Sequence, residues 1–181
     1  MSQAVAVPLT EPYRSRFATG LLLEHLYHWE RTRPGEVTLV QPLGGGRVRE
    51  LTFREVGDEV RRMAAHLRSL GLPPGSAIGL VGRNSAHWLL ADCAIWMAGH
   101  VSVPIFPTLR AASVEHILRH AEVKLLFVGK LDEWEGMKEG IDPALPRIRL
   151  PLAPAVGGEA WEELLARTAP LQGHPSRGAD E

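Results

Sequence analysis

Two glycine-containing segments are the first whose residue types and spacing suggest chemistry, because glycine lets a backbone approach a phosphate closely. Gly44-Gly45-Gly46 stands between two short runs of strand character. A phosphate loop instead follows a strand, opens a helix and usually brings a lysine. We therefore interpret these three glycines as the turn of a β-hairpin.

Residues 79–85 are better placed to meet an anion, because they follow a predicted strand and open a predicted helix. Free N–H groups and the helix dipole attract negative charge at such a point, and Arg83 could add a positive charge. The segment contains neither G-x-G-x-x-G nor G-K-[ST]. We interpret it as a strand-to-helix loop with Asn84 as the N-cap, and an anion site at 82–85 is the alternative.

Histidine pairs are the candidates for metal binding. His116 and His120 are four residues apart on a predicted helix, so they share a face, and two imidazoles at that spacing can bind zinc. No third ligand is evident, and Glu115 does not occupy its place in the H-E-x-x-H pattern. We interpret this pair, and likewise His25 and His28, as solvated or packed side chains.

Cys93 and Asp92 lie together in a strongly apolar predicted helix. Cys93 has no basic neighbour in sequence, so we expect an inert, buried thiol. A lone buried carboxylate is costly, so Asp92 should have a partner or be exposed. There is no Ser-His-Asp arrangement, paired carboxylate cluster or CxxC motif in the sequence. We therefore assign no catalytic, cofactor-binding or metal-ligating residue.

Composition narrows the class of protein. The chain has 181 residues and a formal net charge of -1, which argues against nucleic acid as a partner. A single cysteine excludes an intrachain disulfide and fits a reducing compartment. The N-terminus has no signal-peptide pattern, and the apolar stretch 88–109 is interrupted by Asp92, Pro104 and Pro107. We expect a cytoplasmic protein with at most peripheral membrane contact.

The hydrophobic pattern predicts an α/β fold. A helix at 20–32 and a hairpin of strands 37–41 and 47–52 come first, and Thr52 with Glu55 forms a capping box for the next helix. Predicted strands at 77–81, 101–103, 124–128 and 147–150 then alternate with helices at 85–98, around Val114 and Leu118, at 131–139 and at 161–167. This alternation predicts a parallel sheet of βαβ units with flanking helices. We divide the chain into a loose lead-in (1–18), an α/β segment (19–169) and a flexible tail or linker (170–181).

Residues 51–128 resemble the start of the adenylate-forming (AMP-binding) ligases, and most closely the long-chain fatty acid–CoA ligases. The matching runs are T-F-R-E-V, L-G-L-P-P-G, G-R-N-S-A-H-W, A-G-H-V-S-V-P-I-F-P-T-L and H-A-E-V-K-L-L-F-V, in that order. The run P-I-F-P-T-L favours the long-chain branch. Residues 20–50 match more loosely, and 130–181 weakly. At Arg110 the family often has a small capping residue, so the next helix should begin with a weaker cap.

The resemblance implies an activity that this chain does not complete. Such ligases use ATP and Mg²⁺ to convert a fatty acid to an acyl-adenylate, which the thiol of coenzyme A then attacks. Their Ser/Thr/Gly-rich loop with a lysine, their later acidic motif and their mobile C-terminal domain match nothing here. We therefore expect the N-terminal part of an incomplete large domain, inactive alone, with no cofactor of its own.

Partners follow from the same resemblance. We expect the rest of the same ligase chain to be the main partner, with fatty acid as the substrate of the parent protein. An incomplete domain leaves open sheet edges, through which the isolated chain should self-associate. The alternatives are a small stand-alone nucleotide- or anion-binding module and a structural or oligomerisation module.

Overall fold

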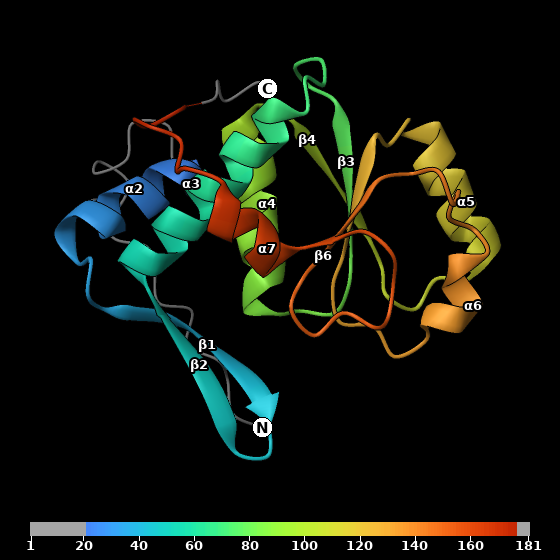
Figure 1. The fold of residues 1–181 in the computed structure, drawn as a ribbon, viewed down its shortest axis with the longest axis horizontal. Coiled ribbons are helices and arrows are strands. Elements are labelled where there is room, and N and C mark those ends of the chain that lie inside the picture. Colours follow the sequence, from blue (N-terminus) through green and yellow to red (C-terminus); the bar gives the residue numbers. More distant parts are fainter. Residues whose placement is uncertain (1–20, 177–181) are drawn as a thin grey trace, which may run out of the picture.

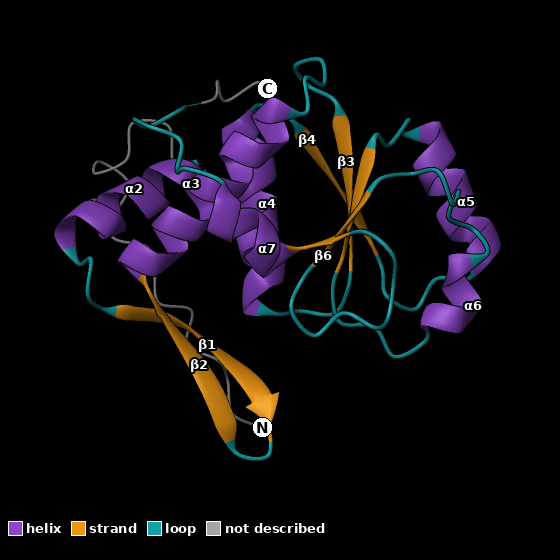
Figure 2. Cartoon of the chain, in the orientation of Figure 1, coloured by secondary structure: helices purple, strands orange, loops and turns teal. Residues whose placement is uncertain are grey.

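The computed structural model describes residues 21–176, so the predicted lead-in 1–18 lies outside the described residues. A five-stranded sheet stands between two sets of helices, and a two-stranded hairpin projects away from them (Figure 1). The secondary-structure view shows the same separation of hairpin and sheet (Figure 2). The predicted α/β fold with a parallel sheet, flanking helices and an N-terminal helix and hairpin is confirmed.

All strands of the main sheet run parallel. They are β3 (Ala77–Val81), β4 (Val101–Ile105), β5 (Leu125–Val128), β6 (Arg147–Arg149) and β7 (Glu159–Ala160), in the order β4-β3-β5-β6-β7. The chain passes from β3 to β4 on one side and then to β5 on the other side of β3. The point where the strand order reverses therefore lies between the carboxyl ends of β3 and β5, where open α/β sheets commonly bind ligands.

Helices cover both faces of this sheet (Figure 1). One side carries α2 (Leu22–Thr32), α3 (Phe53–Ser69), α4 (Ala86–Ala98) and α7 (Trp161–Arg167), and the other carries α5 (Ala111–His120) and α6 (Trp134–Lys138). Because strand side chains alternate, each face has its own core. Leu80 and Phe127 belong to the core of α3, α4 and α7, whereas Val81 and Leu126 belong to the core of α5 and α6.

The start of α3 confirms the predicted capping box. The Glu55 N–H donates to Thr52 Oγ1 at 3.3 Å, and the Thr52 N–H donates to Glu55 Oε2 at 2.7 Å. The predicted N-cap of α4 is wrong, because the cap is Ser85 and not Asn84. The Trp88 N–H donates to Ser85 Oγ at 3.2 Å, and a cap must lie within this short reach of the first turn. At Arg110, α5 has no side-chain cap, as expected.

Strand β4 continues beyond its predicted end at Val103, through Pro104 to Ile105. The Val101 N–H donates to Ser76 O at 3.0 Å on the β3 side of the strand. Backbone groups alternate along a strand, so Ser102 and Pro104 direct theirs to the free edge, where a proline's missing N–H costs no ladder bond. The short strand β7 was not predicted, and α6 is shorter than the predicted 131–139.

The hairpin consists of β1 (Val37–Gly44) and β2 (Arg47–Thr52), paired antiparallel. Gly45 and Gly46 form its turn with φ of 60° and 75°, a conformation that glycine adopts without strain. Leu51 is fully buried and Leu39 packs against the same core, so the root of the hairpin belongs to the helical layer. The interpretation as a hairpin turn is confirmed for Gly45 and Gly46, whereas Gly44 is the last residue of β1, which continues past its predicted end at Gln41.

The described part of the predicted tail lies against the helices. The Leu171 N–H donates to Arg61 O at 3.2 Å, and the Tyr27 hydroxyl donates to Pro175 O at 2.7 Å. The ring of His174 meets Tyr27 edge-on with centroids 4.8 Å apart. These contacts connect 170–176 to α2 and α3. Within residues 21–176, no helix combines the length and apolar character that crossing a membrane requires.

Candidate functional site

The backbones that follow β3 and β5 lie against each other where the strand order reverses. A Cβ placed on Gly82 would lie 3.0 Å from Gly129 Cα. The Arg83 N–H donates to Lys130 O at 2.8 Å, and Arg83 Nη1 donates to Asp132 Oδ2 at 2.5 Å. Arg83, the positive charge of the predicted anion site, therefore forms an ion pair with Asp132.

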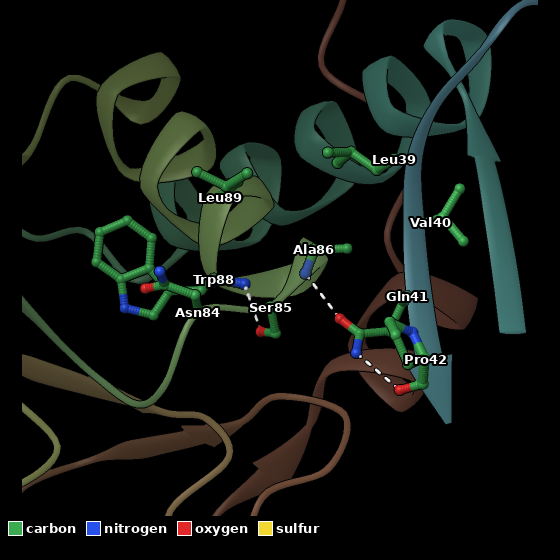
Figure 3. Close-up of a pocket in the computed structure, with 9 residues that line it drawn as sticks. All are labelled: Leu39, Val40, Gln41, Pro42, Asn84, Ser85, Ala86, Trp88 and Leu89. Atoms are coloured by element: carbon green, nitrogen blue, oxygen red, sulfur yellow. Dashed lines mark hydrogen bonds between the residues drawn. The ribbon is translucent and has the colours of Figure 1, made fainter. Parts of the chain in front are cut away.

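Helix α4 begins beside a groove between its first turn and β1 (Figure 3). The groove has a volume of about 370 Å³ and is lined by Leu39, Val40, Gln41, Pro42, Asn84, Ser85, Ala86, Trp88 and Leu89. The Ala86 N–H donates to Gln41 Oε1 at 2.8 Å, and Gln41 Nε2 donates to Pro42 O at 2.9 Å (Figure 3). Gln41 is buried, and nothing in the sequence near residue 84 points to it.

These contacts weaken the interpretation of 82–85 as an anion site. Two N–H groups of the first turn, those of Ala86 and Trp88, already donate to Gln41 and Ser85. A phosphate would have to replace intramolecular acceptors that hold the hairpin to the helix, whereas an anion site offers free donors. The geometry favours the interpretation as a capped strand-to-helix loop.

The histidine pair of α5 is brought together as predicted. The rings of His116 and His120 stack with centroids 5.8 Å apart and an interplanar angle of 9°, and both side chains are exposed. Residues 21–176 contain no group of three or more His, Cys, Asp and Glu side chains arranged to hold a metal ion. The ring of His28 meets Trp29 edge-on, with centroids 4.7 Å apart.

A buried polar cluster joins four elements around Glu59 of α3. Arg49 Nη2 of β2 donates to Glu59 Oε1, and Trp161 Nε1 of α7 donates to Oε2 at 3.0 Å. His87 Nε2 of α4 lies 3.5 Å from Oε2 and 3.1 Å from Arg49 Nη1. Sequence analysis missed this cluster, because Glu59 and Trp161 are 102 residues apart and no local pattern relates them.

The cluster keeps Glu59 ionised at neutral pH. Burial raises the pKa of this carboxyl, but hydrogen bonds from His87 and Trp161 and the charge of Arg49 outweigh burial and hold the pKa below its ordinary value. Both carboxylate oxygens are engaged by the protein. The group therefore fastens the hairpin, α4 and α7 to α3, and its oxygens are committed to that role.

Cys93 and Asp92 occupy α4 as predicted, and the Ser102 hydroxyl lies beside the carboxyl of Asp92. Burial, together with the nearby Asp92 charge, raises the pKa of the Cys93 thiol to about 12, so it stays protonated. Asp92 is buried rather than exposed, and its Oδ1 has no hydrogen-bond partner among the described residues. Burial raises the pKa of its carboxyl, and the Ser102 hydroxyl opposes that shift only in part.

Comparison with known protein families shows to which family the chain belongs. The sequence profile of the family described as "AMP-binding enzyme" matches residues 26–177, which is most of the chain. The chain belongs to the AMP-binding enzyme family. The resemblance seen in the sequence is thereby confirmed.

The curated relatives include CoA ligases and acyl-CoA synthetases, and also peptide synthetases such as "Phosphinothricin tripeptide synthetase PhsC" of Streptomyces viridochromogenes, which is 37% identical over 79 residues, 44% of this chain and 7% of that protein. "Probable CoA ligase CCL6" of Humulus lupulus is 41% identical over 78 residues, which are 43% of this chain and 12% of that protein. "Long chain acyl-CoA synthetase 1" of Arabidopsis thaliana is 36% identical over 77 residues, which are 42% of this chain and 12% of that protein. The chain thus spans about an eighth of the length of the latter two relatives.

Solved structures share the fold. A benzoate CoA ligase from Burkholderia xenovorans LB400 superposes with a TM-score of 0.71 at 24% identity, covering 88% of this chain and 31% of that one. Acetoacetyl-CoA synthetase from Streptomyces lividans gives 0.70 at 28% identity, covering 82% of this chain and 25% of that one. The described α/β segment therefore has the architecture of one part of an AMP-binding enzyme.

Replacing Glu59 with glutamine should destabilise the chain by about 2 kcal/mol at pH 7, because the charged hydrogen bonds of Arg49 and Trp161 are weakened in a buried site. Because the pKa of Glu59 is depressed in the folded chain, its carboxylate stabilises the fold at pH values above its ordinary pKa of 4.5. This stabilisation is lost as the pH falls through the pKa of the folded state. The difference between wild type and Glu59→Gln should therefore shrink in acid. Urea denaturation at several pH values measures it, with the exposed Glu162→Gln as control.

Replacing Asp92 with asparagine should stabilise the isolated chain at pH 7, by on the order of 1 kcal/mol, because a buried charge without a full set of partners is removed. The raised pKa of Asp92 means that wild type loses stability as pH rises from the ordinary value of 3.8 through the folded value. The advantage of Asp92→Asn should thus grow with pH over that window. Thermal melts that show a constant difference, or a less stable variant at pH 7, would contradict this expectation.

Proposed function

We propose that this chain is part of the large domain of a long-chain fatty acid–CoA ligase. In this proposal it is part of the scaffold of that domain and does not catalyse the reaction alone. The main support for this proposal is the match of residues 26–177 to the AMP-binding enzyme family, together with the long-chain acyl-CoA synthetases among the relatives. Five long-chain acyl-CoA synthetases of Arabidopsis thaliana are 36% to 39% identical over 76 to 78 residues. These relatives support long-chain acids as the substrate class of the parent protein.

The proposed reaction has two steps. The fatty acid carboxylate attacks the α-phosphorus of ATP and pyrophosphate leaves, which gives an acyl-adenylate. The thiol of coenzyme A then attacks the acyl carbon and AMP leaves. Both steps develop negative charge on phosphate, so positioned cations must neutralise it. ATP, Mg²⁺ and coenzyme A are thus cofactors and substrates of the parent protein.

The geometry of the described residues supports a role as scaffold rather than as nucleotide site. The loop at 82–85 has its arginine paired with Asp132, and two N–H groups of the following helical turn are occupied by Gln41 and Ser85. A nucleotide would find few free donors there. In this proposal the phosphate-binding residues come from further polypeptide of the same ligase, which is the main partner, and the protein is cytoplasmic.

The complete reading frame provides the first test. It should continue past the codon for Glu181 and soon encode a Ser/Thr/Gly-rich loop containing a lysine, the element that phosphate chemistry needs. A frame that ends at this codon would contradict the proposal and favour a small stand-alone module.

A pyrophosphate-exchange assay provides the second test. The 181-residue chain should give no exchange above a control without acid when it receives ATP, Mg²⁺ and palmitate. The complete protein should exchange with palmitate and much less with benzoate or acetate, because the long-chain relatives indicate an extended acyl site. Clear turnover by the chain itself, or a preference for benzoate, would count against the proposal.

A further inference from the structure

His87, in the first turn of α4, has a cation and an anion against the same ring nitrogen. Its side chain is 2% exposed. Its Nε2 lies 3.1 Å from Arg49 Nη1 of β2 and 3.5 Å from Glu59 Oε2 of α3. The ring meets that of Trp161 of α7 edge-on, with centroids 5.8 Å apart. One buried nitrogen therefore faces two groups of opposite charge.

The proton on this nitrogen decides which of the two contacts is favourable. A guanidinium group has only N–H donors and keeps its charge, so Arg49 can hydrogen-bond to Nε2 only while that nitrogen has no proton. The distance of 3.1 Å to Arg49 is within the hydrogen-bond range, whereas 3.5 Å to Glu59 is outside it. The described geometry is therefore that of a neutral His87 that accepts from Arg49.

Uptake of a proton by His87 reverses this preference. The Nε2–H group then donates to Glu59, and the guanidinium of Arg49 faces a second positive charge. One carboxylate cannot balance two cations, and an unbalanced charge in a buried site is costly. Burial raises the pKa of Glu59, and the hydrogen bond and the charge of His87 are among the causes that lower it. Glu59 therefore binds a protonated His87 favourably.

The other acidic groups around the cluster do not supply the missing negative charge. Asp58 Oδ2 of α3 accepts from Arg62 Nε at 2.7 Å. Glu55 accepts from the N–H and the hydroxyl of Thr52 at the start of α3. Glu162 of α7 lines the same cleft as Arg49 but is exposed, so water screens its charge. The balance of charge within the cluster therefore rests on Glu59.

Arg49 is the member of the cluster that can leave it. Its side chain is 39% exposed, compared with 10% for Glu59 and 2% for His87. A guanidinium that turns outward regains water, whereas Glu59 keeps His87 and the indole N–H of Trp161 as donors. Release of Arg49 removes one of the contacts that fasten the hairpin to the helices. A two-stranded hairpin is marginally stable without such support.

We propose that His87 is a pH-sensitive switch for the β1–β2 hairpin. With a neutral imidazole, Arg49 is held by His87 and Glu59, and the projecting hairpin is fixed to the helices (Figure 1). When Nε2 takes up a proton, Glu59 binds His87, Arg49 turns to water and the outer part of the hairpin becomes mobile. Its root stays in place through Leu51 of the core and the contact of Gln41 with α4. This switch is a property of the fold and is independent of the proposed ligase activity.

NMR spectroscopy of the isotope-labelled 181-residue chain tests the switch. As pH falls from about 8 to 5.5, the range in which imidazole takes up a proton, the Cε1–H resonance of His87 should shift. The ¹⁵N order parameters of Leu43 and Val48 in the outer hairpin should fall with the same midpoint, from about 0.85 to below 0.6. Those of α5 and β5 should keep their high values, because the sheet does not depend on Arg49.

Three variants separate the switch from a general effect of acid. In His87→Gln the hairpin should stay ordered at both pH values, because glutamine can accept from Arg49 and does not titrate. His66→Gln is the matched control, since it removes another buried histidine of the helical layer, and it should respond as wild type does. In Arg49→Gln the hairpin should be mobile at both pH values, because the contact that the proton breaks is already absent.

The remaining outcomes contradict the switch. A hairpin that stays ordered while His87 titrates overturns it, and so does a His87 resonance that does not shift in this range. Loss of order in α5 and β5 at the same midpoint shows acid unfolding of the whole chain and also overturns it. If His87→Gln does not fold, the comparison of wild type with Arg49→Gln decides, because an equal pH response of the two hairpins excludes a role for the Arg49 contact.

Discussion

The hydrogen bond from the Ala86 N–H to the Gln41 side chain is the contact on which much of the structure depends. It satisfies one of the donors that every helix start leaves free, and it does so with a residue of the hairpin. The hairpin has only two strands, which alone are marginally stable in water. Gln41 and the Arg49–Glu59 ion pair fasten it to α4 and α3, and the Gln41 contact also occupies one N–H donor of the candidate anion site at the start of α4.

Local pattern predicted most of the elements, and distance in sequence explains what it missed. The capping box of Thr52 and Glu55 and the glycine turn of the hairpin are complete within a few residues, so the sequence shows them directly. The contact of Gln41 with Ala86 spans 45 residues, and that of Glu59 with Trp161 spans 102. A polar residue in a strand or helix gives no sign of such a partner. Ser85 and Asn84 are both good caps, and only the backbone geometry selects Ser85.

Helix α4 connects the fold to the function. Its uniformly apolar sequence predicted burial on several sides, and most of its residues are buried, Asp92 included, whereas Leu89 is 46% exposed. The chain belongs to the AMP-binding enzyme family, and its curated relatives are much longer than the segment that they share with it.

Calorimetric titration of the chain with ATP and Mg²⁺ tests most directly whether these residues form a nucleotide site by themselves. The account predicts no measurable heat of binding up to millimolar nucleotide, because the donors at the start of α4 and the charge of Arg83 are already engaged. Binding with a dissociation constant in the micromolar range that disappears in Arg83→Ala would contradict it.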